Sequence, residues 1–179
     1  KKVLIEKKAE IFDNPAYAFL GDPKAKITFA EFFDYNCGYC KHAYPDLAKM
    51  VADHPNIRVV LIDTPILGES SDLAARYAVA AKGFGKYVDY HAALMRYNGP
   101  KNEENLLSLA KGVGLDPAKL KEAAAKPDVQ AQIDKNMELF RALGLNGTPA
   151  FAAPDRLIPE FMGPDSLVQI ATEAEGKAK

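Results

Sequence analysis

The stretch from residue 27 to residue 62 constrains the fold of this chain most strongly. Ile27–Phe33 is a nearly continuous apolar run, which is typical of a strand buried on both faces. From Gly38 to Val51 the apolar residues recur at helical spacing, and a second apolar run follows at Ile57–Ile62. A strand, a helix and a strand of these lengths predict a right-handed βαβ unit with parallel strands, so we expect an α/β fold.

The remaining sequence predicts a helical insertion followed by a second part of the same sheet. Residues 70–143 are rich in alanine and show helical periodicity interrupted by Gly and Pro, which predicts four or five helices. Ala150–Ala153 and Arg156–Ile158 are short apolar segments that resemble an antiparallel hairpin. A last helix is expected near residues 165–174, and a short amphipathic helix at residues 1–12.

Size and charge exclude several classes of protein. The chain has 179 residues, 48% of them hydrophobic, which is enough to bury one sizeable core. Its 23 basic and 24 acidic residues leave a net charge of -1, so nothing predicts binding to nucleic acid or to an anionic membrane. No apolar run reaches the roughly 18 residues of a membrane span. The Lys1-Lys2 start has neither an initiator Met nor the apolar region of a signal peptide, and we interpret the chain as trimmed.

The chain has only two cysteines, Cys37 and Cys40, which form a Cys-x-x-Cys motif between the predicted strand and helix. A helix N-terminus stabilises a thiolate, so we expect Cys37 to be the attacking sulfur and Cys40 to resolve a mixed disulfide. Two other interpretations stay open. One is a zinc half-site, which needs further ligands from His42, His54 or His91, and the other is a structural disulfide, which stabilises little because it closes a tiny loop.

Two further positions can carry chemistry. Glu31 is an acid inside an apolar strand, where burial is costly unless the carboxyl group is used. A buried Glu31 has a raised pKa and relays protons to and from Cys40; the alternative is a rim position with the carboxylate in water. Thr148-Pro149 opens a later strand, where the missing N–H of proline costs nothing. Tyr39 and neighbouring tyrosines suit the binding of unfolded peptide, and core packing explains some of them equally well.

The stretch Phe29–Lys41 (FAEFFDYNCGYCK), the later Gly147-Thr148-Pro149 and the helical segment between them resemble the DsbA-like thiol oxidoreductases of bacterial envelopes, which belong to the thioredoxin superfamily. The resemblance implies a thioredoxin fold with an α-helical insertion between a βαβ half and a C-terminal ββα half. The implied division is 1–14 as an N-terminal helix or the remnant of an oligomerisation stalk, 15–64 as the βαβ half, 65–145 as the insertion and 146–179 as the ββα half.

The resemblance also implies roles for individual residues. Pro149 is then a cis-proline that faces the cysteines, and Thr148 offers backbone N–H and C=O groups to a substrate strand. No cofactor and no metal are implied. The implied site residues are Cys37, Cys40 and Glu31 for catalysis, and Thr148, Pro149, Gly38 and Tyr39 for substrate binding.

Partners and location follow from the same resemblance. It implies cysteine-containing substrate proteins, a membrane redox partner and a periplasmic location with the signal peptide removed, because disulfides persist there. Within the family, the Cys-Gly-Tyr-Cys site is most similar to the Com1-like and ScsC-like branch. Some ScsC-like relatives carry an N-terminal stalk, form trimers and act as disulfide isomerases, so we expect a homotrimer for a longer form of this protein.

One departure from the family pattern concerns the residues between the cysteines. The best-known oxidases have Pro-His there, whereas this chain has Gly38-Tyr39. Tyr39 supplies no cationic imidazole, so we hypothesise a higher pKa for Cys37 and a less oxidising disulfide than in those oxidases. The expected function is disulfide oxidation or isomerisation, and the alternative is Cu(I) binding or copper tolerance through the same dithiol.

Overall fold

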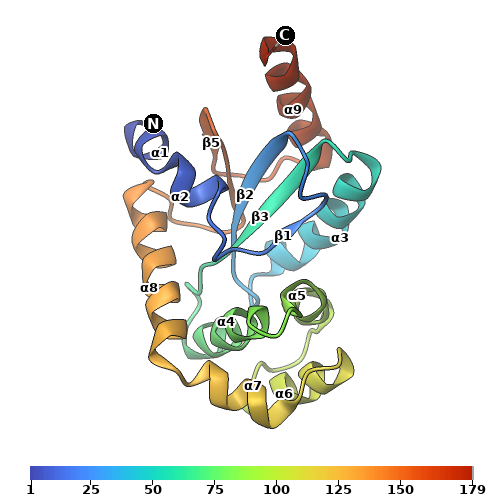
Figure 1. The fold of residues 1–179 in the computed structure, drawn as a ribbon, viewed down its shortest axis with the longest axis vertical. Helices are drawn as coiled ribbons and strands as arrows, with labels where there is room; N and C mark the ends of the chain where they lie inside the picture. The colour runs from blue at the N-terminus through green and yellow to red at the C-terminus, as the bar shows by residue number, and fades with distance from the viewer. Residues whose placement is uncertain (179) are drawn as a thin grey trace.

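The computed structural model describes residues 1–178 and shows a sheet flanked by helices (Figure 1). Within these residues the sheet has five strands in the order β1-β3-β2-β4-β5. The strands are β1 (Phe19–Leu20), β2 (Ile27–Phe33), β3 (Ile57–Asp63), β4 (Ala150–Ala153) and β5 (Arg156–Ile158). The helices are α1 (Lys2–Glu6), α2 (Lys8–Phe12), α3 (Gly38–Asp53), α4 (Glu69–Lys82), α5 (Tyr87–Arg96), α6 (Glu103–Gly112), α7 (Pro117–Ala124), α8 (Pro127–Ala142) and α9 (Pro164–Ala178).

The predicted βαβ unit and hairpin are confirmed. β2 and β3 run parallel, with Ile27 opposite Ile57 and Phe33 opposite Asp63, and α3 connects them. β4 pairs with β2 and β5 pairs with β4, both antiparallel, as expected for the hairpin. The α/β fold with a helical insertion is therefore confirmed. The antiparallel pairing of β1 with β3 was not predicted, because a two-residue strand shows no periodicity.

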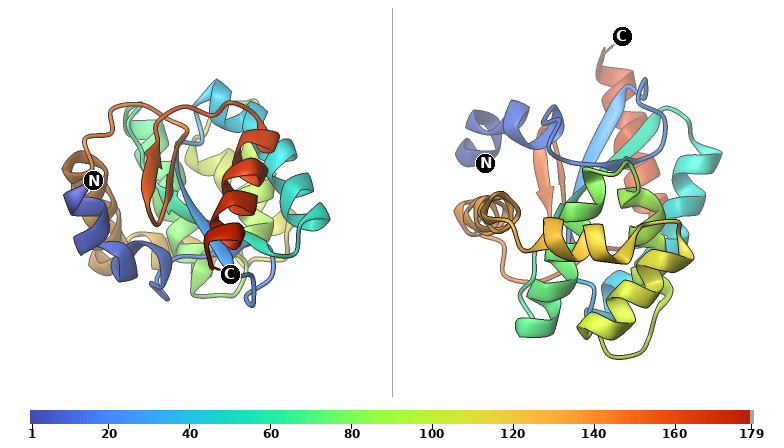
Figure 2. Two further views of the ribbon diagram at one scale, coloured as in Figure 1. Left: turned by 90° about the horizontal axis from the view of Figure 1, so that it is seen from above. Right: turned by 60° about the horizontal axis from the view of Figure 1, so that its bottom comes forward.

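Each face of the sheet has its own hydrophobic core. Alternate residues of a strand point to opposite faces, so Phe29 and Phe33 of β2 belong to one core and Ala30 and Phe32 to the other. Figure 2 shows α8 and the N-terminal helices on one side of the sheet, with α3 and α9 on the other side. Because both faces are covered, nearly every residue of β2 is buried, which explains its continuous apolar sequence.

The helical insertion contains α4 to α8 within the described residues. Helices α4 to α7 gather at one end of the sheet, and α8 returns along the face that α1 and α2 also cover (Figures 1 and 2). Local signals set the helix ends. Asp116 caps α7 by accepting a hydrogen bond from the Lys119 N–H at 3.2 Å, and Pro117 occupies the first turn, where its missing N–H costs nothing.

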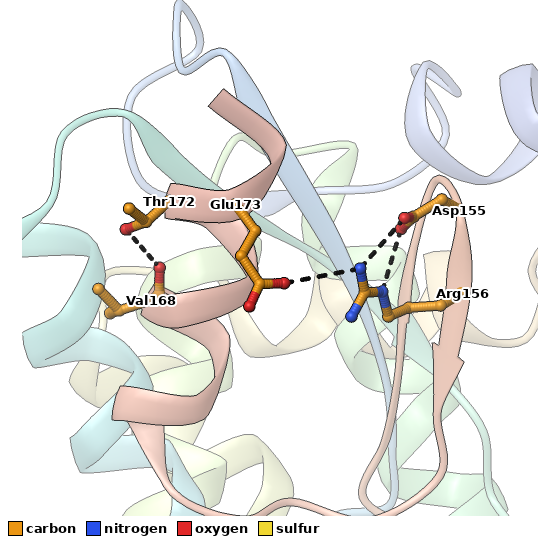
Figure 3. Close-up of polar contacts among 5 residues, drawn as sticks. All are labelled: Asp155, Arg156, Val168, Thr172 and Glu173. Carbon is orange, nitrogen blue, oxygen red and sulfur yellow. Dashed lines mark hydrogen bonds and ion pairs between the residues drawn. The ribbon is translucent and has the colours of Figure 1, made fainter. Parts of the chain in front are cut away.

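The C-terminal helix packs on the larger core beside the hairpin. The Arg156 guanidinium group lies 3.3 Å from the Asp155 carboxylate and 3.9 Å from the Glu173 carboxylate of α9 (Figure 3). Exposed ion pairs of this kind contribute little to stability, because water and salt screen them. Leu167 and Ala171, which are buried in the larger core, therefore contribute more to holding α9 in place.

The N-terminal segment is helical, as expected for residues 1–12, but it is divided into two short helices. The helix breaks at Lys7, and Leu4, Ile11 and Phe12 are all buried in the second core. The break allows both halves to place apolar side chains on the sheet. Over residues 1–178, every helix is too short or too polar to cross a membrane.

Candidate active site

Cys37 and Cys40 lie at the start of α3, close to the buried end of β2. Cys37 is the N-cap residue of the helix, and its Sγ accepts a hydrogen bond from the Cys40 backbone N–H at 3.2 Å. Both cysteines are free thiols and are 6% and 0% exposed, respectively. The first turn of α3 therefore holds a buried dithiol, with the more accessible sulfur at the helix N-terminus.

The two thiols have opposite acidities. Hydrogen bonding from the Cys40 thiol lowers the pKa of Cys37 to about 6, although burial and the nearby Asp34 carboxylate act in the opposite direction. This value falls in the range of about 3.5 to 7.5 that is typical of activated cysteines. Burial raises the pKa of Cys40 above its ordinary value, and the hydrogen bond to Cys37 and the charge of Glu31 act in the same direction. Near neutral pH, Cys37 is the thiolate and Cys40 keeps its proton.

Glu31 lies in the middle of the sheet, not at its rim. It sits opposite Leu61 of β3 and Phe151 of β4, and it is 2% exposed. Burial raises its pKa to about 8, with a smaller contribution from the charge of Cys37. The burial that the sequence predicted is observed, and the carboxyl group holds its proton at neutral pH. Its catalytic role stays a prediction.

The segment before β4 lies against the dithiol. The peptide bond between Thr148 and Pro149 is cis. The Cys37 thiol donates a hydrogen bond to the Thr148 carbonyl oxygen, with the two atoms 3.4 Å apart. Residues that are 111 positions apart in the sequence are thus brought together at the nucleophile.

A groove of about 590 Å³ opens beside the dithiol. Tyr39 is 79% exposed at its edge, and space around Gly38 is open. Phe161 forms part of the wall and packs against Phe151, with ring centroids 5.4 Å apart. The full lining comprises Tyr39, His42, Ala43, Asn146, Gly147, Thr148, Pro149, Pro159, Glu160 and Phe161. The four predicted substrate-binding residues therefore lie at or beside one groove, whose walls are mainly aromatic and aliphatic.

Asp34, which directly follows β2 and was not predicted as a site residue, organises the loop that carries Cys37. Its Oδ1 accepts hydrogen bonds from the Asn36 N–H at 2.7 Å and the Ser71 hydroxyl at 2.8 Å. Its Oδ2 accepts from the Ile66 and Leu67 N–H groups at 2.9 and 3.0 Å. An acid directly after a buried strand and three residues before a reactive cysteine was the available signal.

Three buried polar residues were also missed. Tyr35 and Asp63 are 1% and 3% exposed, and His91 is fully buried on α5. For Tyr35 and Tyr44 the core-packing alternative holds, because both lie in the larger core. The side chains of Tyr35, Asp63 and His91 come together only in the folded chain, so their spacing along the sequence does not predict this cluster.

The zinc half-site is not formed by the histidines considered for it. Across residues 1–178, no group of three or more His, Cys, Asp or Glu side chains is placed to hold a metal ion. His91 is enclosed by aromatic rings, whereas His42 faces the substrate groove and His54 ends α3.

Comparison with known proteins gives a consistent family. Residues 28–174 match the family described as a DSBA-like thioredoxin domain. A thioredoxin-like oxidoreductase from Silicibacter pomeroyi DSS-3 has a similar solved structure, with 42% identity, a TM-score of 0.89 and coverage of 96% of this chain and 99% of that chain. The catalytic domain of Proteus mirabilis ScsC is also similar, with 26% identity, a TM-score of 0.86 and coverage of 96% of each chain.

The curated relatives are longer than this chain, some of them much longer. Disulfide bond formation protein D of Bacillus subtilis (strain 168) is 28% identical over 171 residues, which cover 88% of this chain and 77% of the relative. The Na(+)/H(+) antiporter NhaA 1 of Salinispora arenicola is 28% identical over 133 residues, and the match spans only 20% of the antiporter's length. Similar domains thus occur within longer proteins.

Proposed function

The chain belongs to the family of DSBA-like thioredoxin domains, which are thiol-disulfide oxidoreductases, and from this membership we propose that it exchanges disulfides with protein cysteines through Cys37 and Cys40. The observation that carries the proposal is the paired acidity of the two thiols. Cys37 ionises readily at a helix N-terminus, whereas the buried Cys40 retains its proton. A dithiol of this kind has one nucleophile and one resolving group.

The oxidising reaction runs in two exchanges. A substrate thiolate attacks the Sγ of Cys37 in the disulfide form, the Cys37–Cys40 bond breaks, and the sulfur of Cys40 leaves with the electron pair. A second substrate thiolate then attacks the substrate sulfur of the mixed disulfide and releases Cys37 as a thiolate. The substrate is oxidised and the pair is reduced. In isomerisation the reduced Cys37 thiolate attacks a substrate disulfide and releases one substrate thiolate, and a different substrate thiolate then attacks the substrate sulfur of the mixed disulfide and releases Cys37, with no net oxidation.

Glu31 transfers a proton during these exchange steps. The leaving sulfur of Cys40 becomes a buried anion, which is costly unless it gains a proton. Glu31 is buried and is protonated at neutral pH, and once it is ionised its charge raises the pKa of Cys40. It therefore supplies the proton to Cys40 during oxidation of a substrate and takes it back in the reverse direction.

Thr148 and the groove bind the substrate peptide. A substrate strand that pairs with the Thr148 backbone places its own cysteine sulfur at Cys37, because the Thr148 carbonyl already lies 3.4 Å from that sulfur. Side chains beside the substrate cysteine then enter the groove between Tyr39, Pro149 and Phe161. Apolar walls suit segments of unfolded proteins, which expose apolar side chains.

The cellular setting is part of the proposal. The proposal includes a periplasmic location, envelope proteins as substrates and a membrane redox partner, and the location is supported by similarity to a periplasmic thioredoxin-like protein from Salmonella enterica serovar Typhimurium. A homotrimer through an N-terminal stalk is proposed for a longer form. Light scattering tests it, since a stalk-bearing form must elute as an oligomer and the present chain as a monomer.

Copper binding is the less favoured function. A Cu(I) ion bound by two sulfurs needs both as thiolates. Burial raises the pKa of Cys40, which opposes that state. Stoichiometric Cu(I) uptake by the reduced protein, lost in Cys37→Ser, would favour the copper function over exchange.

Redox equilibration tests the proposed function. The full chain is incubated in a series of glutathione buffers, and the reduced fraction is measured by alkylation and mass spectrometry; each 30 mV corresponds to about 1.4 kcal/mol. We expect a reversible transition, oxidation of a reduced unfolded protein, and a trapped mixed disulfide at Cys37 in a Cys40→Ala variant. A pair that stays oxidised in every buffer and traps no substrate would contradict the proposal. Cys37→Ser is the matched control and must trap nothing.

A further inference from the structure

Four buried polar side chains form a hydrogen-bonded chain beside the segment that carries Cys37, and the mechanism above uses none of them. Asp63, at the end of β3, accepts a hydrogen bond from the Tyr87 hydroxyl at 2.6 Å. The Tyr87 oxygen lies 3.5 Å from the Tyr35 oxygen, which in turn lies 2.8 Å from His91 Nδ1. All four residues are no more than 5% exposed.

The chain ties the helical insertion to the nucleophile. Tyr35 precedes Cys37 by two residues, whereas Tyr87 and His91 lie one turn apart on α5 of the insertion. The His91 ring also packs edge-on against Tyr44 of α3, with ring centroids 5.4 Å apart. Helix α5 therefore contacts both the segment before Cys37 and the helix after it.

Both ends of the chain are left without partners. Among the described residues, Asp63 Oδ1 and His91 Nε2 are buried and make no hydrogen bond. Burial raises the pKa of Asp63 to about 7 and lowers that of His91 to about 3. Unpaired buried polar atoms are destabilising, and apolar side chains of similar size would avoid that cost. Packing alone does not account for these residues.

The number of available protons makes the chain sensitive to the state of Asp63. When Asp63 is ionised, Tyr87 donates to it and Tyr35 donates to Tyr87, so neutral His91 carries its proton on Nδ1 and donates it to the Tyr35 oxygen. When Asp63 is protonated, Asp63 can donate to Tyr87, Tyr87 to Tyr35 and Tyr35 to His91. The proton on Asp63 thus decides the direction of the hydrogen bonds along the chain and which nitrogen of His91 carries a proton.

Several titratable groups face this chain from the surrounding elements. Asp34 raises the pKa of Asp63, and hydrogen bonding to the two tyrosines acts in the opposite direction. The Asn136 side chain of α8 donates to the Asp63 backbone carbonyl at 3.0 Å. The titratable or charged groups near the chain are Asp34 after β2, Glu31 in β2, Tyr17 before β1, Tyr90 and Arg96 in α5, and Tyr44 in α3.

We propose that Asp63, Tyr87, Tyr35 and His91 are positioning residues of the exchange reaction, through which the protonation of Asp63 sets the placement of Cys37. The helical insertion thereby tunes the reactivity of the dithiol. The proposal rests on the thiol-disulfide activity proposed above and adds to it a group that acts without touching the substrate. Neither Asp63 Oδ1 nor His91 Nε2 needs to contact a sulfur for this role, because Tyr35 transmits the change in hydrogen bonding to the segment that carries Cys37.

Conservative variants of the full chain test this role. Asp63→Asn and Tyr87→Phe keep the shapes of the side chains and remove the titration and the short hydrogen bond, respectively. The measurements are the equilibrium constant with glutathione and the alkylation rate of Cys37 between pH 5 and pH 9. We expect each variant to change the equilibrium constant by about threefold, the size of one net hydrogen bond, and to lose an inflection near pH 7. The double variant must match the larger single effect, because both changes break one chain.

Tyr90→Phe is the matched control. Tyr90 is fully buried on the same helix, but its hydroxyl donates to the Leu106 carbonyl at 2.8 Å, outside the chain. Its loss must lower the urea midpoint and leave both redox measurements unchanged. If Asp63→Asn does not fold, Tyr87→Phe and Tyr35→Phe decide.

Two outcomes overturn the proposal, and a third concerns only its premise. Variant profiles that superimpose on the wild type, or a Tyr90→Phe effect as large as that of Tyr87→Phe, refute the positioning role while exchange itself stands. A wild-type protein that exchanges with neither glutathione nor unfolded protein refutes the proposed function instead.

Discussion

Replacing Glu31 with Gln removes a buried acid while keeping its size and shape. The pKa of Glu31 is about 8 in the folded chain, against an ordinary value of 4.5. Between these values the folded state holds a proton that the unfolded state has lost. The stability linked to this group is therefore fully present below pH 4.5 and is lost progressively as the pH rises towards 8.

The magnitude follows from this interval. A pH of 7 is 2.5 units above the ordinary pKa of 4.5, and each unit corresponds to about 1.4 kcal/mol. Keeping Glu31 protonated in the folded state at pH 7 therefore lowers the free energy of unfolding by about 3 kcal/mol. Glu31→Gln is expected to raise the free energy of unfolding by up to that amount at pH 7, and by less than about 1 kcal/mol at pH 5. Part of the pKa shift comes from the charge of Cys37, so the gain must be smaller in the disulfide form.

Urea unfolding followed by circular dichroism, at pH 5, 6, 7 and 8 with excess reductant, measures this effect. Glu122→Gln, an exposed change on α7, controls for the loss of an acid and is expected to have no pH-dependent effect. Exchange by Glu31→Gln must also be slower, because the amide cannot pass a proton to Cys40. Parallel pH profiles for the wild type and Glu31→Gln would show that the carboxyl group does not titrate in this range, and the proton-transfer role would fall with the stability argument.

Three further outcomes are expected. Cys40→Ala raises the alkylation midpoint of Cys37 above about 6, because the thiol hydrogen bond is lost, whereas Cys40→Ser keeps a donor and shifts the midpoint less; equal midpoints would contradict this cause. Asp34→Asn lowers the Cys37 midpoint and costs roughly 2 kcal/mol or more in urea unfolding, since an amide cannot accept all four hydrogen bonds. Two model peptides, with Lys or with Glu beside their cysteine, test the charge of the groove. Glu160→Gln is expected to reduce the ratio of kcat/KM for the Lys peptide to that for the Glu peptide by about twofold to fivefold, whereas Tyr39→Ala weakens binding of both peptides. An unchanged ratio in Glu160→Gln would show that Glu160 does not set the selectivity of the groove.

Local patterns predicted the parts of the fold that local physics controls. Burial on both faces makes β2 continuously apolar, and this run followed by a helical repeat was sufficient to place the βαβ unit and the N-terminal position of Cys37. Glu31 could be identified because an acid inside such a run is costly. The strand β1 and the break at Lys7 could not, since two residues carry no periodicity and the break depends on the sheet beneath it.

The polar surroundings of the dithiol depend on long-range contacts, which explains why they were missed. Three of the four hydrogen bonds that Asp34 accepts come from groups more than 30 positions away, in the loop before α4 and in α4 itself. His91 meets Tyr35 across 56 positions of sequence. In isolation, each is an ordinary polar residue at a strand end or on a helix, and only the packing of the insertion against the sheet makes them neighbours of the nucleophile.

The three buried carboxyl groups near Cys37 differ in what keeps them inside. Asp34 accepts four hydrogen bonds, which satisfy its buried carboxyl oxygens. Glu31 is held among apolar side chains, which favour its neutral form, and Asp63 has one strong donor and one orphaned oxygen, which leaves its two forms nearly balanced at neutral pH. An exchange reaction must keep one sulfur ionised and return a proton to the other. The three groups therefore serve different steps: Asp34 holds the loop of Cys37, Glu31 donates a proton, and Asp63 changes its protonation near neutral pH. Only the first of these stabilises the fold, and we therefore expect Glu31→Gln to gain stability, whereas Asp34→Asn loses it.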